Sequence, residues 1–293
     1  MIKLELYDIF LDCIDKWAKK EFDNRLEEAI DRFEEWERDF DKDEGNIVSD
    51  LLKRFSYYSK KEIQDIIKDL SDNSIEQFGI SNQDSVISVV RKIDGKLNSS
   101  YEYWMLHRME SGLSKKIYFD SIDGIDDAFW ENIRKVVYVD DCSGTGVQFV
   151  EFLKRQKKSL LNKHVILIVI EIMKEAKDYI FDYAAQNSIN LDIIFYAEKD
   201  KAFNKSKNME RDLFVKLSEK HDINKSYIMG FKQAEALMAF YNNSPNDTLG
   251  IFWLLSEKNK PIFEREIEEE PGWKKISRGK NRRRKQQYEA KAN

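Results

Sequence analysis

One stretch decides the fold: residues Val136 to Phe149 read VVYVDDCSGTGVQF. Its first four residues are apolar and β-prone, which is typical of a buried parallel strand. Asp140 and Asp141 then fall at the carboxyl end of that strand. From Gly146 onward, apolar residues recur at helical spacing. The stretch therefore predicts a strand, a loop of small residues and a helix, which is the repeating unit of an α/β fold.

The same order of residues predicts a kind of ligand. In open α/β sheets ligands bind outside the carboxyl ends of the strands, and helix N-termini attract phosphate. Two carboxylates beside a phosphate-sized loop suit a ligand that has neighbouring hydroxyls on one side and a phosphate on the other. A sugar phosphate has this chemistry.

The stretch resembles the phosphoribosyl pyrophosphate (PRPP) binding loop of type I phosphoribosyltransferases. The resemblance implies a phosphoribosyltransferase-like (Rossmann-like) parallel sheet flanked by helices. It also implies that Asp140 and Asp141 are the catalytic pair that faces the ribose 2′ and 3′ hydroxyls. Val147 and Gln148 depart from the family pattern, which usually has a second small residue followed by Thr or Ser. The implied phosphate-binding residues are Cys142, Ser143, Gly144, Thr145, Gly146, Val147 and Gln148.

An earlier strand and loop add candidate binding residues. Residues 86–90 read as a strand, and the resemblance places pyrophosphate at the loop that follows it. Lys96 would offer charge there, and Ser99 and Ser100 would join the free N–H groups of the next helix. Asn-Ser-Ser before a helix is equally typical of an ordinary N-cap. The resemblance further implies Mg²⁺, held through the ligand, with Asp140 and Asp141 as candidate ligands.

Strands and helices alternate along the middle of the chain. Residues 165–170 and 191–196 are predicted strands, and residues 174–186 between them are a predicted helix. We therefore expect residues 81–263 to form the α/β domain. Residues 1–80 are predicted to be a helical region packed on that core, because apolar residues follow helical spacing from Phe10 to Trp17. That stripe also suits a protein partner.

The C-terminal part carries a second resemblance. Residues 234–241 show helical spacing, and Asn243 to Leu249 then read NSPNDTL. This segment is similar to one in the phosphoribosyltransferase-like proteins of bacterial conflict (anti-phage defence) systems, and the match extends over roughly residues 30 to 265. Asn246 and Asp247 suit a tight turn after Pro245 or a direct role in the site.

The tail changes character again. Residues 264–293 are acidic and then basic, a pattern that is often disordered. The basic run from Lys274 to Lys285 suits contact with nucleic acid or with an acidic partner.

Composition excludes some classes of protein. The chain has 293 residues, of which 42% are hydrophobic and 35% charged, and a net charge of −5. No apolar run approaches the ~20 residues of a membrane span, so we expect no membrane partner. Two cysteines and no evident signal peptide favour a reducing compartment, and we expect a cytoplasmic protein. Lys- and Asn-rich usage favours a bacterial source.

Three functions stay open at this point. The first is a pentosyltransferase-class enzyme that acts on PRPP or a related nucleotide or sugar phosphate, as an effector or sensor in bacterial defence. The second is a catalytically inactive nucleotide-binding module that signals through the N-terminal helices. The third is an S-adenosylmethionine (SAM) dependent methyltransferase, because DDCSGTG also resembles the first motif of adenine methyltransferases. The sequence leaves the acceptor base and the oligomeric state open.

Overall fold

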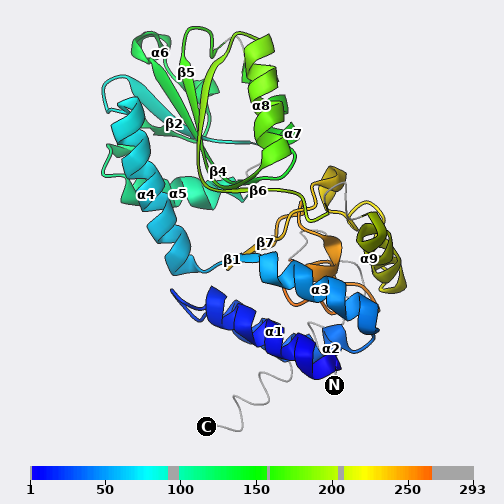
Figure 1. Cartoon of the computed structure of the whole chain (residues 1–293). Coiled ribbons are helices and arrows are strands. Elements are labelled where there is room, and N and C mark those ends of the chain that lie inside the picture. The colour runs from blue at the N-terminus through cyan, green and yellow to red at the C-terminus, as the bar shows by residue number, and fades with distance from the viewer. Residues whose placement is uncertain (1, 92–98, 157–158, 204–207, 266–293) are drawn as a thin grey trace, which may run out of the picture.

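A parallel β-sheet forms the centre of the larger part of the molecule (Figure 1). The computed structural model describes residues 2–91, 99–156, 159–203 and 208–265. The sheet has five strands in the order β3-β2-β4-β5-β6, and every neighbouring pair is parallel. This confirms the predicted α/β class. The strands are β2 Ser85–Val89, β3 Tyr118–Phe119, β4 Lys135–Ser143, β5 His164–Met173 and β6 Asn190–Lys199.

Helices cover both faces of this sheet (Figure 1). Helices α4 and α5 pack together on one face, and helices α7 and α8 pack together on the other. The chain leaves β2 toward one edge of the sheet and leaves β4 toward the other. The carboxyl ends of β2 and β4 therefore form a topological switch point, where ligands of open α/β sheets bind. The helices are α4 Lys60–Phe78, α5 Ser100–Glu110, α6 Asp127–Asn132, α7 Val147–Gln156 and α8 Lys174–Gln186.

Local sequence signals explain where α4 begins and ends. The Ser59 side chain accepts a hydrogen bond from the Glu62 N–H, as expected of an N-cap. The helix ends at Gly79, whose φ of +62° is left-handed and suits glycine. Ile63 and Ile67 on its apolar side are fully buried in the core of the sheet. The predicted helix at 174–186 is likewise confirmed at both ends by α8.

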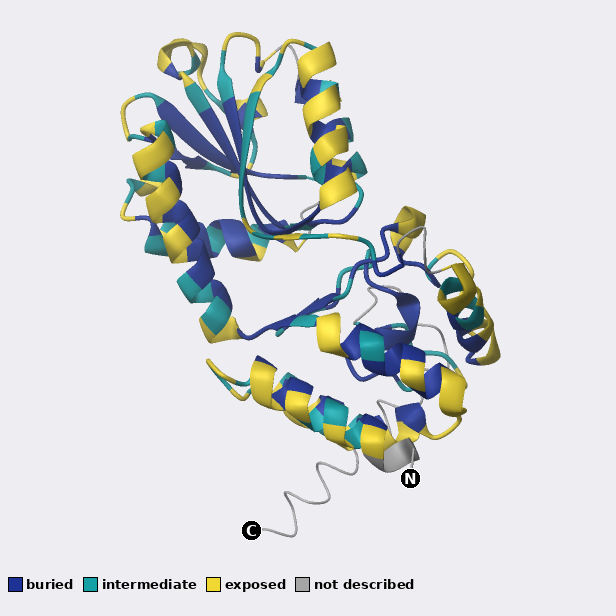
Figure 2. Ribbon diagram, in the orientation of Figure 1, coloured by how far each residue is buried: buried dark blue, intermediate teal, exposed yellow. Residues whose placement is uncertain are grey.

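A second hydrophobic core lies beside the first (Figure 2). The N-terminal helices build it together with the C-terminal segment, and the predicted apolar stripe from Phe10 to Trp17 is buried inside it. A small parallel pair, β1 Ser56–Tyr58 with β7 Met238–Phe240, joins the segment that follows the first three helices to the C-terminal segment. The predicted domain boundaries at residues 80 and 263 stay a prediction. The helices of this core are α1 Ile2–Trp17, α2 Asn24–Glu37, α3 Lys42–Arg54 and α9 Asn208–Lys220.

The helix expected over residues 234–241 is wrong. The chain there forms a short 3-10 turn, Phe231–Gln233, and then the strand β7. Lys232, Gln233 and Glu235 all have positive φ, which an α-helix does not allow. Other 3-10 turns are Lys115–Ile117, Ile122–Gly124 and Gly250–Phe252.

Two further expectations concern a membrane span and the C-terminal tail. Within the described ranges, no helix has both the length and the apolar character that a membrane crossing requires. The tail, including the basic run from Lys274 to Lys285, lies outside the described residues.

Candidate functional site

The two predicted carboxylates lie inside the central strand. β4 continues through both of them to Ser143, because its ladder with β5 extends to the pair Ser143 and Ile172. Asp140 is 5% exposed and Asp141 is 7% exposed. The N–H of Asp141 donates to Asp140 Oδ1 at 3.0 Å, and the N–H of Cys142 donates to Asp141 Oδ1 at 2.9 Å. Each carboxylate is thus held by the backbone of the residue that follows it.

This pair has unusual electrostatics. Burial, followed by the neighbouring charge of Asp141, raises the pKa of Asp140 well above its usual range. Hydrogen bonds from the Asp141 backbone and from the Ser100 side chain oppose that shift. A ligand that brings hydroxyl donors would stabilise two carboxylates placed this closely, as would a cation.

The loop after the strand is short and leads directly into a helix. Gly144, Thr145 and Gly146 connect β4 to α7, whose first turn begins with the bond from Val150 N–H to the Gly146 carbonyl at 3.0 Å. Gly146 has a φ of +72°, and a Cβ there would lie 2.8 Å from the Ala176 carbonyl oxygen. The turn therefore needs glycine at this position. The first N–H groups of α7 are the donors that such a turn offers to an anion.

The structure brings the NSPNDTL segment to this loop. A Cβ built on Gly144 would lie 2.3 Å from Asp247 Cγ and 2.5 Å from Asp247 Oδ2, so the Asp247 side chain lies directly against Gly144. Burial and then the charge of Asp141 raise the pKa of Asp247 to about 6, while a hydrogen bond from the Gly144 backbone and the charge of Arg265 lower it. The turn at Asp247 and the loop at Asp140 are thus parts of one site.

The earlier loop reaches the same place through one serine. Ser100 is fully buried, its hydroxyl donates to the Val90 carbonyl at 3.0 Å, and its side chain lowers the pKa of the neighbouring Asp140. Ser99 is at the N-cap position of α5, but it is exposed and its side chain makes no capping hydrogen bond. Lys96 lies outside the described residues. Val147 is half-buried and Gln148 is exposed at the start of α7.

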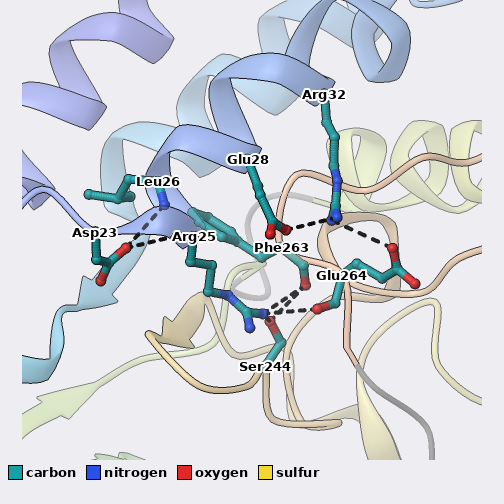
Figure 3. Close-up of polar contacts among 8 residues, drawn as sticks. All are labelled: Asp23, Arg25, Leu26, Glu28, Arg32, Ser244, Phe263 and Glu264. Carbon is teal, nitrogen blue, oxygen red and sulfur yellow. Dashed lines mark hydrogen bonds and ion pairs between the residues drawn. The ribbon is translucent and has the colours of Figure 1, made fainter. Parts of the chain in front are cut away.

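An arginine of the N-terminal helices anchors the segment that carries Asp247 (Figure 3). Arg25 of α2 donates from Nη2 to Ser244 Oγ at 2.8 Å. The same nitrogen donates to the carbonyls of Phe263 and Glu264 at 3.2 and 3.1 Å. Asp23 caps α2 beside it by accepting from the Leu26 N–H at 3.1 Å. The N-terminal helices are therefore tied to the same turn that contacts Gly144.

A family model ties these features together. The PRTase-CE model matches residues 33–265, which include both acids, the loop and the Asp247 turn. The chain belongs to the PRTase-CE family. It is therefore a phosphoribosyltransferase-like protein, as the resemblance implied.

Two solved phosphoribosyltransferase structures are similar to part of this PRTase-CE chain. A Helicobacter pylori xanthine-guanine-hypoxanthine phosphoribosyltransferase is 12% identical, with a TM-score of 0.34, over 53% of this chain and 96% of that one. An orotate phosphoribosyltransferase from Aeropyrum pernix is 15% identical, with a TM-score of 0.28, over 50% of this chain and 73% of that one. Neither similarity is high enough to transfer residue roles. No curated protein matched.

A glutamate that sequence reasoning missed lies beside the loop of this PRTase-CE protein. Glu171 of β5 is fully buried and pairs across the sheet with Cys142. Tyr58 donates to its Oε2 at 2.6 Å. Burial raises the pKa of Glu171 to about 7, although the hydrogen bond from Tyr58 lowers it. The signal in the sequence was a single acid near the end of the apolar run 165–173.

Cys142 does not have the character of a nucleophile. Burial raises the pKa of its thiol well above the usual value, and the charges of Asp141 and Asp247 raise it further. The thiol is therefore protonated at neutral pH, when it is a poor nucleophile. Cys142 is a small residue of β4 next to the loop.

The described side chains do not form a metal site of their own. Within the described ranges there is no group of three or more His, Cys, Asp or Glu side chains placed to hold a metal ion. Asp140 and Asp141 also use oxygen atoms to accept backbone N–H groups. The Mg²⁺ expected through the ligand stays a prediction, and such an ion would depend on oxygen atoms of the ligand.

Proposed function

We propose that this protein binds PRPP or a related nucleotide or sugar phosphate at the loop from Asp140 to Gly146. The observation that carries the proposal is the position of the two buried carboxylates. They lie at the switch point of a parallel sheet, and only Cys142 and Ser143 separate them from the glycine turn that leads into α7. This is the arrangement in which open α/β sheets bind phosphate-bearing ligands. The family match over residues 33–265 supports the same conclusion.

The proposed ligand matches the groups of the site one by one. Ribose hydroxyls donate to the carboxylates of Asp140 and Asp141, which relieves the mutual repulsion of two buried acids. The 5′-phosphate accepts from the backbone N–H groups of the turn and of the first turn of α7. Mg²⁺ would accompany a pyrophosphate-bearing ligand and would neutralise part of its charge.

The reaction follows from this binding mode. In the proposed transfer an acceptor base forms a bond to the ribose C1 while the bond from C1 to pyrophosphate breaks, which develops positive charge on the sugar ring and negative charge on the leaving pyrophosphate. The two carboxylates favour the positive ring, and fixed positions of the hydroxyls and the phosphate align the bond that breaks. The protein supplies orientation and charge and forms no covalent bond to the ligand.

A role as an effector or sensor in bacterial anti-phage defence is part of this proposal. The resemblance of the NSPNDTL segment to proteins of conflict systems supports it. The contact between Asp247 of that segment and Gly144 adds a physical reason why the segment would matter to the loop.

Calorimetric titration tests the binding proposal. The ligands are PRPP with Mg²⁺ and, as the rival, SAM. The variants are Asp141→Asn and, as a matched control, Asp182→Asn, which makes the same charge change at an exposed position of α8. We expect saturable PRPP binding that Asp141→Asn abolishes and Asp182→Asn preserves. Binding of SAM without PRPP would reverse the assignment in favour of the methyltransferase alternative.

The catalytically inactive module is the second candidate, and one observation favours it. Arg25 connects α2 to the turn that carries Asp247, so the N-terminal helices have a direct contact with the candidate site. Pyrophosphate release separates the two candidates. An enzyme releases pyrophosphate from PRPP when a base acceptor is present, whereas a binding module leaves PRPP intact at ligand concentrations that saturate it.

A further inference from the structure

Asp247 is fixed at the Gly144 turn by its side chain and by its backbone. The side chain lies against Gly144. On the other side, the Asp247 carbonyl oxygen would lie 2.0 Å from a Cβ on Gly230, whose φ is +71°. The same carbonyl accepts the Ala236 N–H at 3.1 Å. Asp247 is therefore held between two glycines that leave room for it.

Neighbouring residues hold the turn itself. Thr248 Oγ1 donates to the Met238 carbonyl at 2.7 Å, and the Asn246 carbonyl accepts the Phe231 N–H at 2.7 Å. At its other end, Ser244 Oγ donates to the Phe263 carbonyl at 2.8 Å and accepts from Arg25 (Figure 3). These contacts fix the position from which the Asp247 carboxylate reaches the loop.

The Asp247 carboxylate occupies the space next to Gly144, because a Cβ built there would lie 2.5 Å from Asp247 Oδ2. Gly144 belongs to the turn which, in the proposed function, receives the phosphate of the ligand. Carboxylate and phosphate are both anionic acceptors, and each forms strong hydrogen bonds with backbone N–H groups. Two such anions repel each other at contact distance, so they do not occupy this turn together.

We propose that Asp247 is a specificity-determining residue whose carboxylate competes with the phosphate of the ligand for the space at Gly144. The inference rests on the proposed function, because it concerns a phosphate-bearing ligand at the same loop. A phosphate binds there only when the carboxylate moves away from Gly144 or loses its charge. Asp247 thus sets the affinity of the loop and selects against weak anionic ligands.

The charged and titratable groups around Asp247 agree with this role. Asp141 of β4 repels the Asp247 carboxylate, and Arg265 of the C-terminal segment attracts it. The Cys142 thiol also faces it and is neutral, because burial raises the pKa of Cys142. As pH falls toward the Asp247 pKa of about 6, the competitor loses its charge. A phosphate monoester keeps at least one negative charge through this range, so the repulsion between the phosphate and Asp247 falls.

The first experiment follows the Gly144 N–H without any ligand. Selective ¹⁵N labelling of the 11 glycines leaves a simple spectrum in which this signal is tracked from pH 4.5 to pH 8. We expect the wild-type signal to titrate with Asp247 and the signal of Asp247→Ala to stay constant. A constant Gly144 signal in the wild type overturns the inference, whatever the protein binds.

The second experiment measures affinity for inorganic phosphate and for PRPP with Mg²⁺ by calorimetry. Asp247→Ala removes both the charge and the acceptor, and we expect binding about tenfold tighter or more. The isosteric Asp247→Asn removes only the charge, and its expected gain is smaller. The control Asp182→Asn, on the exposed side of α8, should stay within about twofold of the wild type.

The outcomes separate this inference from the proposed function. If Asp247→Ala and Asp247→Asn weaken PRPP binding or leave it unchanged while the wild type binds well, Asp247 is not a competitor and the proposed function stands. If no variant and no wild-type protein binds PRPP or phosphate, the proposed function fails and the inference fails with it.

Discussion

Glycine-to-alanine substitutions at four positions test whether Asp247 is held as closely as the structure shows. The four positions differ in two independent respects, the sign of φ and the space available for a Cβ. Gly124 has neither constraint, and Gly79 has a φ of +62° but open space. Gly144 is blocked by the side chain of Asp247, and Gly230 has both a φ of +71° and a blocked Cβ position.

The expected losses of unfolding free energy follow from these two respects. Alanine at a left-handed position costs about 1 to 2 kcal/mol, which applies to Gly79→Ala. Overpacking costs about 1 to 3 kcal/mol, which applies to Gly144→Ala because a Cβ there would lie 2.3 Å from Asp247 Cγ. Gly230→Ala has both penalties and meets backbone atoms, so we expect about 3 kcal/mol or more. Gly124→Ala should stay within about 0.5 kcal/mol of the wild type.

Urea unfolding gives the free energies, and tryptophan fluorescence and circular dichroism both monitor the transition. The two signals must give coincident transitions before a single free energy is assigned, because the chain has two hydrophobic cores. Asp247→Gly provides an internal check, since it removes the three side-chain atoms nearest to the Gly144 Cβ position. In that background, the cost of Gly144→Ala should fall to the cost of Gly124→Ala.

Two results would refute this reasoning. Equal losses for Gly230→Ala and Gly79→Ala would mean that Asp247 does not approach Gly230 closely. An unchanged cost of Gly144→Ala in the Asp247→Gly background would mean that another group blocks that position. Either result would remove the geometric basis for a fixed Asp247 carboxylate at the loop.

Two other predictions concern the anchor and the buried glutamate. Arg25→Ala should lower the free energy of unfolding by about 2 to 3 kcal/mol, because it leaves the Ser244, Phe263 and Glu264 oxygens without this donor. The control is the exposed Arg38→Ala, which should cost about 0.5 kcal/mol or less in the same urea unfolding. A similar loss in both variants would contradict the anchoring role of Arg25. Burial raises the pKa of Glu171 to about 7 in the folded protein, so the folded state keeps a proton that the unfolded state has already lost. The free energy of unfolding should therefore fall as pH rises from about 4.5 to about 7. Glu171→Gln should flatten that part of the stability profile, and an unchanged slope would show that Glu171 is already ionised in the folded protein.

Local patterns were sufficient for four of the five strands of the sheet, β2, β4, β5 and β6, but not for the edge strand β3. β5 could be predicted because burial on both faces makes a parallel strand apolar throughout, and α8 could be predicted as a helical run between two such strands. The segment around Ala234 misled the same reasoning. Its apolar spacing imitates a helix, but the pairing of β7 with β1, from the other end of the chain, determines its conformation. Local sequence does not contain that pairing.

The candidate site was also predictable from sequence only in part. Asp140 and Asp141 could be located because they follow an apolar run, although β4 continues past them to Ser143. The contacts of Asp247 with Gly144 and of Tyr58 with Glu171 join residues that are far apart in sequence. Neither partner signals the other, so only the three-dimensional fold brings these groups together.

The position of Asp247 changes what the glycine turn says about function. A glycine directly after a strand with two acids is usually explained by the close approach of a phosphate to the backbone. Here Gly144 already has a close neighbour in the protein itself, because the Asp247 side chain fills the space that a Cβ would need. The turn therefore does not by itself demonstrate phosphate binding. The paired acids at the switch point carry that argument, and the Asp141 and Asp247 variants separate the two explanations because they are expected to change affinity in opposite directions.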